Sequence, residues 1–250
     1  MAKKSEGRVL LEAQERLSEH INEEHDQGKG ELLRQFILGG QDGTVNVLGI
    51  ILAVATATND VKVVLIAGLA ATFAESISMG AVAYTSSKAA RDHYRREQER
   101  EMHEIREHPE SERQEVRDIY MLRGFRGRLL EEIVDKISSN DDEMLRFMMH
   151  EELNMSEAGD LNPLSEAFMV GFSAIVGSLI PLAAFFFMPV KSAMVASLVI
   201  STSVLFIAGA IKAKYTVGSW LKAGVEMAVI GMIAAIAGYA VGAILGVAIA

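Results

Sequence analysis

The sequence predicts an all-α membrane protein: five transmembrane helices, with a cytosolic helical insert between helices 2 and 3. Half of the 250 residues are apolar, and 23% are charged. The charged residues gather in 1–35 and 88–160, whereas apolar runs fill 36–87 and 163–250. Because each apolar run is long enough to cross a bilayer once or more, these two populations indicate a membrane protein with a soluble insert.

The N-terminal segment, residues 1–35, predicts an amphipathic helix. Val9, Leu10, Leu17 and Ile21 lie on one apolar stripe, with charged residues elsewhere. Such a helix either lies along the membrane or docks on the insert. The segment is too charged to supply the apolar region of a signal peptide, so we expect none.

Two transmembrane helices are expected within 36–87 and three within 161–250. Each apolar run can cross about 30 Å of hydrocarbon at about 1.5 Å per helical residue. The expected spans are 36–58, 62–86, 164–188, 192–213 and 221–249. Only residues 59–61 join the first two spans, which therefore form an antiparallel hairpin. Pro181 is expected to kink the third span and Pro189 to end it.

Lysine and arginine in the flanking segments predict the orientation. The N-terminal segment and the insert are rich in both, and the loop after the fourth span carries Lys212, Lys214 and Lys222. The loops on the opposite side offer only Lys62 and Lys191. Since cytoplasmic loops hold the excess, we expect the N-terminus and insert in the cytosol and the C-terminus on the other side. Cysteine is absent, which excludes disulfides, Cys-ligated zinc and iron–sulfur clusters.

An aspartate lies inside the first span. An ionisable group within a bilayer costs several kcal/mol on most scales, so it indicates function and needs a partner. Asp42 is expected about 9 Å from the cytosolic end of its helix. The returning second span carries Met79 at a similar depth and Glu75 one turn deeper on the same face. Asp42, Glu75 and Met79 are therefore predicted to form a polar stripe between two helices.

This stripe indicates a path for a divalent transition metal. Oxygen ligands alone suit magnesium or calcium, whereas a thioether favours a softer ion. The ordinary alternatives are that Met79 only fills space and that Glu75 is a neutral, protonated packing residue. Asp42 is harder to explain in that way, because an acid at this depth requires water, a cation or a proton.

The insert, predicted as the helical metal-binding domain 88–160, repeats glutamates at helical spacing. The first expected helix carries His93, Glu97, Glu101 and Glu104 on one face, and the second, which starts at Pro109, carries Glu112 and Glu115. A third helix is expected over 125–138. The fourth, capped by 139–142, carries Met148 and Glu152. Facing helices of this kind can chelate several divalent ions. Glutamates interleaved with arginine are more commonly solvated ion-pair faces. The insert histidines, His93, His103, His108 and His150, follow no spacing typical of zinc enzymes.

Several short motifs in order resemble the vacuolar iron transporter family of iron/manganese transporters, also called nodulin-21-like. These are DG in the first span, SISMG near the end of the second and followed by a tyrosine, DHY, PESE, and FMMHEEL before the third span. The resemblance covers about 36–250. It implies a homodimer of five-span subunits that exchanges cytosolic Fe²⁺, with Mn²⁺ as a second candidate, for protons.

The resemblance also implies roles for single residues. Asp42 and Met79 match the family's pathway residues. The positions that match its cytosolic iron ligands are Glu101, Glu104, Glu112, Glu115, Met148 and Glu152. One departure concerns the second span, where relatives usually carry a glutamate at the position of Ala71. Glu75, four residues later on the same face, is interpreted as its substitute.

The sequence therefore predicts a proton-coupled divalent metal transporter that moves metal out of the cytosol, and not an enzyme. It contains no nucleophile triad or phosphate loop, we expect no prosthetic group, and the net charge of −9 argues against a nucleic-acid partner. The alternatives are a membrane-anchored iron sensor or iron-oxidising module, and a passive divalent cation channel. Glycine and alanine in the first and fifth spans suit the homodimer. The expected location is the cell membrane if the source is prokaryotic, or the vacuolar membrane if it is eukaryotic.

Overall fold

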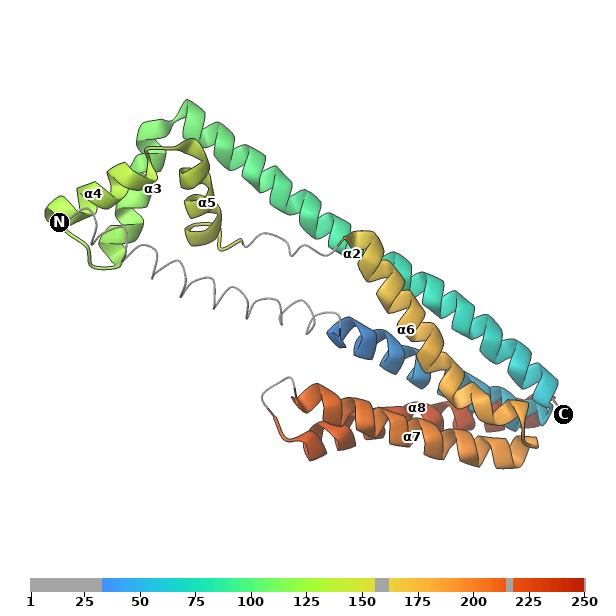
Figure 1. Cartoon of the computed structure of the whole chain (residues 1–250). Coiled ribbons are helices and arrows are strands. Elements are labelled where there is room, and N and C mark those ends of the chain that lie inside the picture. Colours follow the sequence, from blue (N-terminus) through green and yellow to red (C-terminus); the bar gives the residue numbers. More distant parts are fainter. Residues whose placement is uncertain (1–32, 156–161, 215–217, 250) are drawn as a thin grey trace, which may run out of the picture. The chain divides into compact units, whose positions relative to one another are not determined.

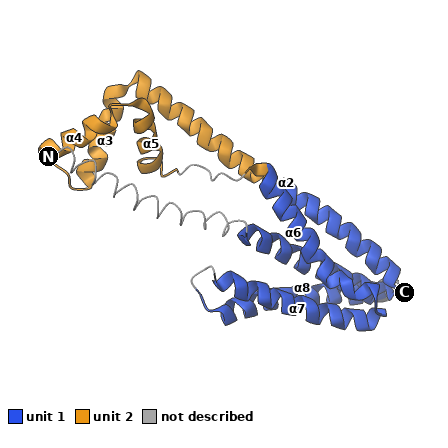
Figure 2. Cartoon of the chain, in the orientation of Figure 1, with its two compact units in different colours: residues 1–83, 164–250 blue, residues 84–163 orange. Residues whose placement is uncertain are grey.

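The computed structural model of the chain describes residues 33–155, 162–214 and 218–249 (Figure 1). All regular elements among these residues are helices. The chain divides into two compact units, which Figure 2 colours separately: residues 1–83 with 164–250, and residues 84–163. The predicted N-terminal amphipathic helix lies almost wholly outside the described residues.

The first unit contains five helices that are long and apolar enough to cross a membrane. They are the first helix (Leu33–Thr58), α2 (Val61–Glu107), α6 (Pro163–Ala183) continued by the 3₁₀ turn η1 (Ala184–Phe186), α7 (Val190–Lys214) and α8 (Trp220–Ile249). The prediction of an all-helical chain with five membrane-spanning helices is confirmed. We call residues 1–83 and 164–250 the membrane unit.

The hairpin between the first helix and α2 turns within two residues. The N–H of Asn59 donates to the carbonyl of Ala55 at 3.0 Å, and Asn59 adopts a positive φ of 48°. Asp60 then accepts a hydrogen bond from the N–H of Lys62 at 2.7 Å. An aspartate at this position satisfies one of the unpaired donors at a helix start, so Asp60 caps α2.

The two prolines of the third span lie at and just beyond the C-terminal end of α6. Pro181 lies inside α6, which continues to Ala183 before it narrows into η1. Pro189 directly precedes α7, and its carbonyl accepts the N–H of Ala193 at 2.9 Å. Since proline lacks a donor, it is best tolerated where a helix begins or where the ladder is already ending.

Helix α2 is a single helix of 47 residues that passes from the membrane unit into the second unit. The predicted start of the insert, residue 88, lies within this helix. No proline interrupts the segment from Val61 to Glu107. The helix ends where Pro109 follows, because the residue before a proline disfavours the helical conformation, and His108 has φ −131° and ψ 49°.

Backbones in the membrane unit approach closely at glycines of the first helix. A Cβ atom on Gly177 of α6 would lie 2.0 Å from the carbonyl oxygen of Gly40, and one on Gly238 of α8 would lie 2.0 Å from that of Gly49. The hydroxyl of Thr44 donates to the carbonyl of Gly177 at 2.9 Å. Small residues allow such contacts between helices in lipid, so the first helix is held between α6 and α8.

The second unit, residues 84–163, combines the distal part of α2 with α3 (Pro109–Leu122), α4 (Gly127–Ile137) and α5 (Asp141–Glu151). We call it the insert. Its buried core consists of Ile105, Val116, Leu130, Val134, Met144, Leu145, Met148 and Met149. The side chain of Asn140 accepts the N–H groups of Asp142 and Glu143 at 2.8 and 3.3 Å, which caps α5.

Gly177→Ala is expected to destabilise the membrane unit, because its methyl group would overlap the backbone of Gly40. Overpacking of this kind costs roughly 1–3 kcal/mol. The thermal unfolding midpoint in detergent measures the effect. Gly218→Ala is the matched control, since no atom lies within 4 Å of its Cβ position. Equal midpoints for the two variants would contradict the close contact.

Candidate functional site

A pair of carboxyl groups lies inside the membrane unit. Asp42 on the first helix and Glu75 on α2 are close enough for their side chains to interact directly. The amide of Asn46 donates to Oε1 of Glu75 at 2.6 Å. Asp42 and Glu75 are half-buried, and Asn46 is exposed. Two neighbouring helices therefore combine two acids and an amide at one place.

Helical spacing explains how these residues meet. Asp42 and Asn46 are one turn apart, so they project from the same face of the first helix. On α2, Met79 follows Glu75 by one turn and is also half-buried. The structure thus brings together Asp42 and Glu75 of the predicted stripe and places Met79 one turn along the same face of α2.

Asn46 was not among the residues predicted for this site. An amide within an apolar span, four residues after an aspartate, is a usable signal for a second polar group on that face. The hydrogen bond that Asn46 donates to Oε1 of Glu75 orients this carboxyl group and leaves its other oxygen for a cation or proton.

A second group of carboxylates lies in the insert. Glu101 on α2, Glu112 on α3 and Glu152, which directly follows α5, each offer an oxygen, and these oxygens lie within 4.8 Å of one another. Glu101 and Glu112 are only 2% and 5% exposed. Each has one carboxylate oxygen that is buried with no hydrogen-bond partner among the described residues. We call these three residues the glutamate cluster.

Burial and mutual repulsion perturb the acids of this cluster. Burial, together with the charges of Glu112 and Glu152, raises the pKa of Glu101 to about 8. Burial also raises the pKa of Glu112, and it raises that of Glu152 to about 7. Although Glu152 is exposed as a residue, its carboxyl group faces the two buried ones. A divalent cation would remove the repulsion that now favours protonation.

The other predicted ligands differ in their surroundings. Glu104 and Glu115 are half-buried beside the cluster, and their charges raise the pKa values of its members. Glu104 also accepts a hydrogen bond from Arg100 at 3.2 Å. Met148 is fully buried in the core of the insert, one turn before Glu152. The structure therefore gathers the five predicted glutamates, and Met148 lies in the core of the insert one turn before Glu152.

The arginines of the insert pair with other acids. Ion pairs join Arg113 to Asp135, Arg117 to Glu131, Arg123 to Glu151, Arg128 to Glu132, and Arg100 to Glu97 and Glu104. In the part of the chain that the structure describes, no ion pair includes Glu101, Glu112 or Glu152. The expected ion-pair faces are therefore present, but the glutamate cluster stands apart from them.

The raised pKa values predict how the metal-free protein responds to pH. Folded Glu101 holds a proton up to about pH 8, whereas the ordinary value is 4.5, so the folded state binds more protons across this window. Stability from this group is therefore present at low pH and falls as the pH rises toward 8. Glu101→Gln should raise the thermal midpoint at pH 8 relative to the wild type and leave it nearly unchanged at pH 4.5.

Thermal unfolding of the metal-free protein between pH 4.5 and 8 measures this difference. Glu99→Gln, an exposed position on the same helix, is the control and should follow the wild type at every pH. A Glu101→Gln curve parallel to the wild type would show that Glu101 does not titrate in this window.

Comparison with known proteins identifies the family of the chain. The VIT family model matches residues 33–243. Vacuolar iron transporter 1 of Arabidopsis thaliana is 33% identical over 234 residues, which is 93% of each chain. Vacuolar iron transporter 1 of Tulipa gesneriana is 30% identical, and the match covers 89% of this chain and 92% of the relative. The vacuolar iron transporter of Plasmodium falciparum is also 30% identical, and the match covers 89% of this chain and 85% of the relative. The resemblance found in the sequence motifs is confirmed, and the chain belongs to the VIT family.

Proposed function

We propose that this protein is a proton-coupled transporter that moves Fe²⁺, with Mn²⁺ as a second cargo, out of the cytosol. The VIT family is a family of transporters, so the chain is a transport protein and not an enzyme. The interaction of Asp42 with Glu75 inside the membrane unit is the observation that carries the proposal. Two adjoining acids form the simplest site at which a divalent ion can replace protons.

Competition for these carboxyl groups couples the two fluxes. Two carboxylates side by side repel each other, and either a proton or a cation relieves that repulsion. A divalent cation neutralises both charges and displaces the proton. When the metal leaves on the far side, protons from that side reload the acids. Met79, one turn from Glu75, adds a thioether that favours Fe²⁺ over magnesium or calcium.

The glutamate cluster supports a role in collecting metal. Its three carboxylates converge within 4.8 Å and are not neutralised by the arginines of the insert. Oxygen ligands accept Fe²⁺ and Mn²⁺ readily but select poorly among first-row ions. We assign Glu104 and Glu115 to the rim of this site, and we assign Met148 to it as a thioether ligand.

The same proposal includes topology and assembly. The lysines after the fourth span and the arginines of the insert favour the cytosol for the insert and the N-terminus. We propose a homodimer in which two copies share the pathway. We favour the cell membrane for a prokaryotic source and the vacuolar membrane for a eukaryotic one, in line with the names of the relatives.

Other functions predict different fluxes. A metal sensor or an iron-oxidising module that is only anchored by the helices moves no metal. A passive channel moves metal without a pH gradient. Transport that requires an opposing proton gradient separates the proposal from all of these, because only exchange depends on both ions.

The flux assay tests the membrane carboxyl pair directly. In proteoliposomes with an imposed pH gradient, Asp42→Asn should reduce Fe²⁺ flux to the level of empty liposomes, and Glu75→Gln should reduce it well below the wild type. Each variant leaves a single ionisable carboxyl group in the pair, so the two charges of a divalent ion are no longer neutralised there. Asp60→Asn, which keeps an oxygen for the cap of α2, is the control and should transport normally. Undiminished flux through Asp42→Asn would refute the pathway.

A binding experiment tests the glutamate cluster separately. Glu101→Gln combined with Glu112→Gln should weaken divalent metal binding to the full-length protein by about 100-fold, since even outer-sphere partners contribute roughly 10- to 100-fold. Calorimetry with Mn²⁺ avoids oxidation. Glu99→Gln with Glu110→Gln changes two exposed positions on the same two helices and should bind like the wild type. Equal affinities in the two double variants would remove the collecting role.

A further inference from the structure

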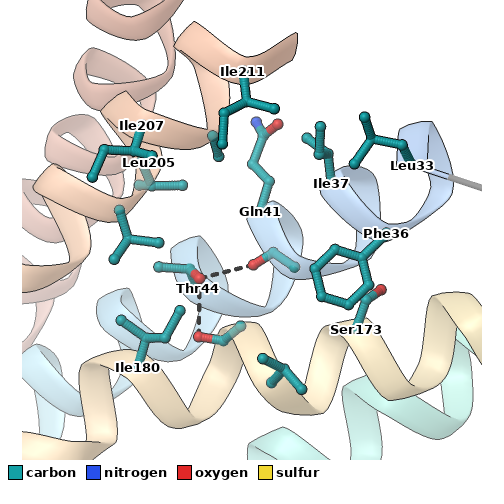
Figure 3. Close-up of a pocket in the computed structure, with 15 residues that line it drawn as sticks. Leu33, Phe36, Ile37, Gln41, Thr44, Ser173, Ile180, Leu205, Ile207 and Ile211 are labelled. Atoms are coloured by element: carbon teal, nitrogen blue, oxygen red, sulfur yellow. Dashed lines mark hydrogen bonds between the residues drawn. The ribbon is translucent and has the colours of Figure 1, made fainter. Parts of the chain in front are cut away.

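The membrane unit contains an apolar cavity of about 240 Å³ between the first helix, α6 and α7 (Figure 3). Its walls include Leu33, Phe36, Ile37, Val204, Ile207 and Ile211. Thr44 also lines it, but its hydroxyl donates to the carbonyls of Gly40 and Gly177, as the dashed lines show. The carboxyl pair described above takes no part in this cavity. Its lining suits a hydrocarbon chain and not a metal ion.

A polar pocket of about 340 Å³ lies at the end of α7 and the start of α8. Its polar lining residues are Gln41, Lys212, Ser219, Lys222 and Glu226. Lys222 and Glu226 are exposed and are one helical turn apart on α8. The lysines and the serine provide donors, and the glutamate provides one acceptor. Two ammonium groups and a hydroxyl group can donate to one phosphate, so this pocket suits a ligand with a negative group.

Gln41 lines both the apolar cavity and this polar pocket, which we call the basic pocket because of its two lysines, so the two spaces adjoin. A third hollow, of about 490 Å³, shares Ile207 and Ile211 with the cavity and is also lined by Lys214 and Trp220. Trp220 is 60% exposed and packs edge-on against Phe206, with ring centroids 6.3 Å apart. Tryptophan at a helix end marks the level of lipid headgroups.

We propose that these adjoining spaces bind one anionic phospholipid, with its phosphate at Lys212, Ser219 and Lys222 and an acyl chain in the apolar cavity. An amphipathic ligand is required because a basic pocket and an apolar cavity meet at Gln41. The membrane itself supplies such a ligand at the depth where Trp220 lies. Basic pockets between membrane helices bind anionic headgroups by the same chemistry.

The headgroup chemistry narrows the choice of lipid. Lysine binds phosphate as a point charge, which explains attraction to any phospholipid with net negative charge. Glu226 opposes a second negative charge but can accept a hydrogen bond from a headgroup hydroxyl. Phosphatidylglycerol, with one charge and two free hydroxyl groups, is therefore the best probe, and phosphatidylcholine with the same chains is its neutral counterpart.

The lipid would contact the helix that carries Asp42, because Gln41 is its neighbour in the chain. A ligand that fills the cavity adds contacts between the first helix and α7 that the protein alone lacks. Binding is therefore expected to raise the thermal unfolding midpoint of the protein as well as to retain the lipid, since a ligand specific to the folded state stabilises it.

Native mass spectrometry of the delipidated full-length protein tests the proposal. Dioleoyl phosphatidylglycerol should bind with a stoichiometry of one per chain and more tightly than dioleoyl phosphatidylcholine. Lys212→Gln combined with Lys222→Gln should weaken this binding by roughly tenfold to thirtyfold, because each lysine near a lipid surface contributes about a factor of five. Lys191→Gln, at the opposite end of α7, is the matched control and should bind like the wild type.

A second variant tests the apolar half. Ile207→Trp fills the cavity and should weaken phosphatidylglycerol binding while both lysines remain. Inorganic phosphate is the comparison ligand, and it should neither bind as tightly nor raise the thermal midpoint as much as the lipid.

Three results would overturn the proposal. Equal lipid affinity in the double lysine variant and in Lys191→Gln would show that the basic pocket does not hold the headgroup. Phosphate binding as tight as that of the lipid would assign the site to a free anion. Lipid binding to monomers but not to dimers would show that a second copy of the chain, and not a lipid, occupies the cavity.

Discussion

The close approach of backbones around the first helix is the constraint on which the membrane unit depends. Gly177 of α6 lies so close to the carbonyl of Gly40 that a Cβ atom on it would overlap that carbonyl. Gly238 of α8 lies equally close to the carbonyl of Gly49. In lipid there is little hydrophobic drive to bring helices together, so such contacts and the hydrogen bond from Thr44 supply the packing. With two sides of the first helix occupied in this way, the face that carries Asp42 is left to meet α2 and Glu75. The position of the carboxyl pair thus follows from glycines that make no contact with it.

The two acidic sites show how a protein keeps carboxyl groups available for an external cation. Burial of Glu101 and Glu112 without hydrogen bonds to one oxygen of each costs stability, because an unpaired buried polar group loses its hydration. The insert offsets this cost with its core of aliphatic and methionine side chains and with arginine pairs on its surface. Those arginines would neutralise the cluster if they reached it. Their pairing with Asp135, Glu131 and Glu151 keeps them away from the cluster, whose three acids take part in no ion pair among the described residues.

Local patterns predicted much of this structure, and tertiary packing decided the rest. Apolar run length was sufficient for the five spans, and Asn140 was recognisable as a cap because its side chain acts within its own turn. The continuity of α2 was not recognised, because a change of composition near residue 88 suggests a boundary although no residue there breaks a helix. Helical spacing placed Glu101 and Glu112 on the faces of their own helices. It could not show that both faces meet Glu152, since that depends on how three helices pack. The adjoining pockets at Gln41 likewise combine residues from distant segments.

The same reasoning explains why Met148 and Met79 differ although both are methionines next to acids. Met148 is fully buried in the core of the insert, one turn before Glu152, so close packing holds its side chain in place. Met79 is half-buried on a membrane helix, one turn from Glu75, and its flexible side chain can turn toward that acid without disturbing a core. A movable thioether in the membrane unit and a fixed one in the insert are therefore expected to contribute differently to any selectivity for softer ions.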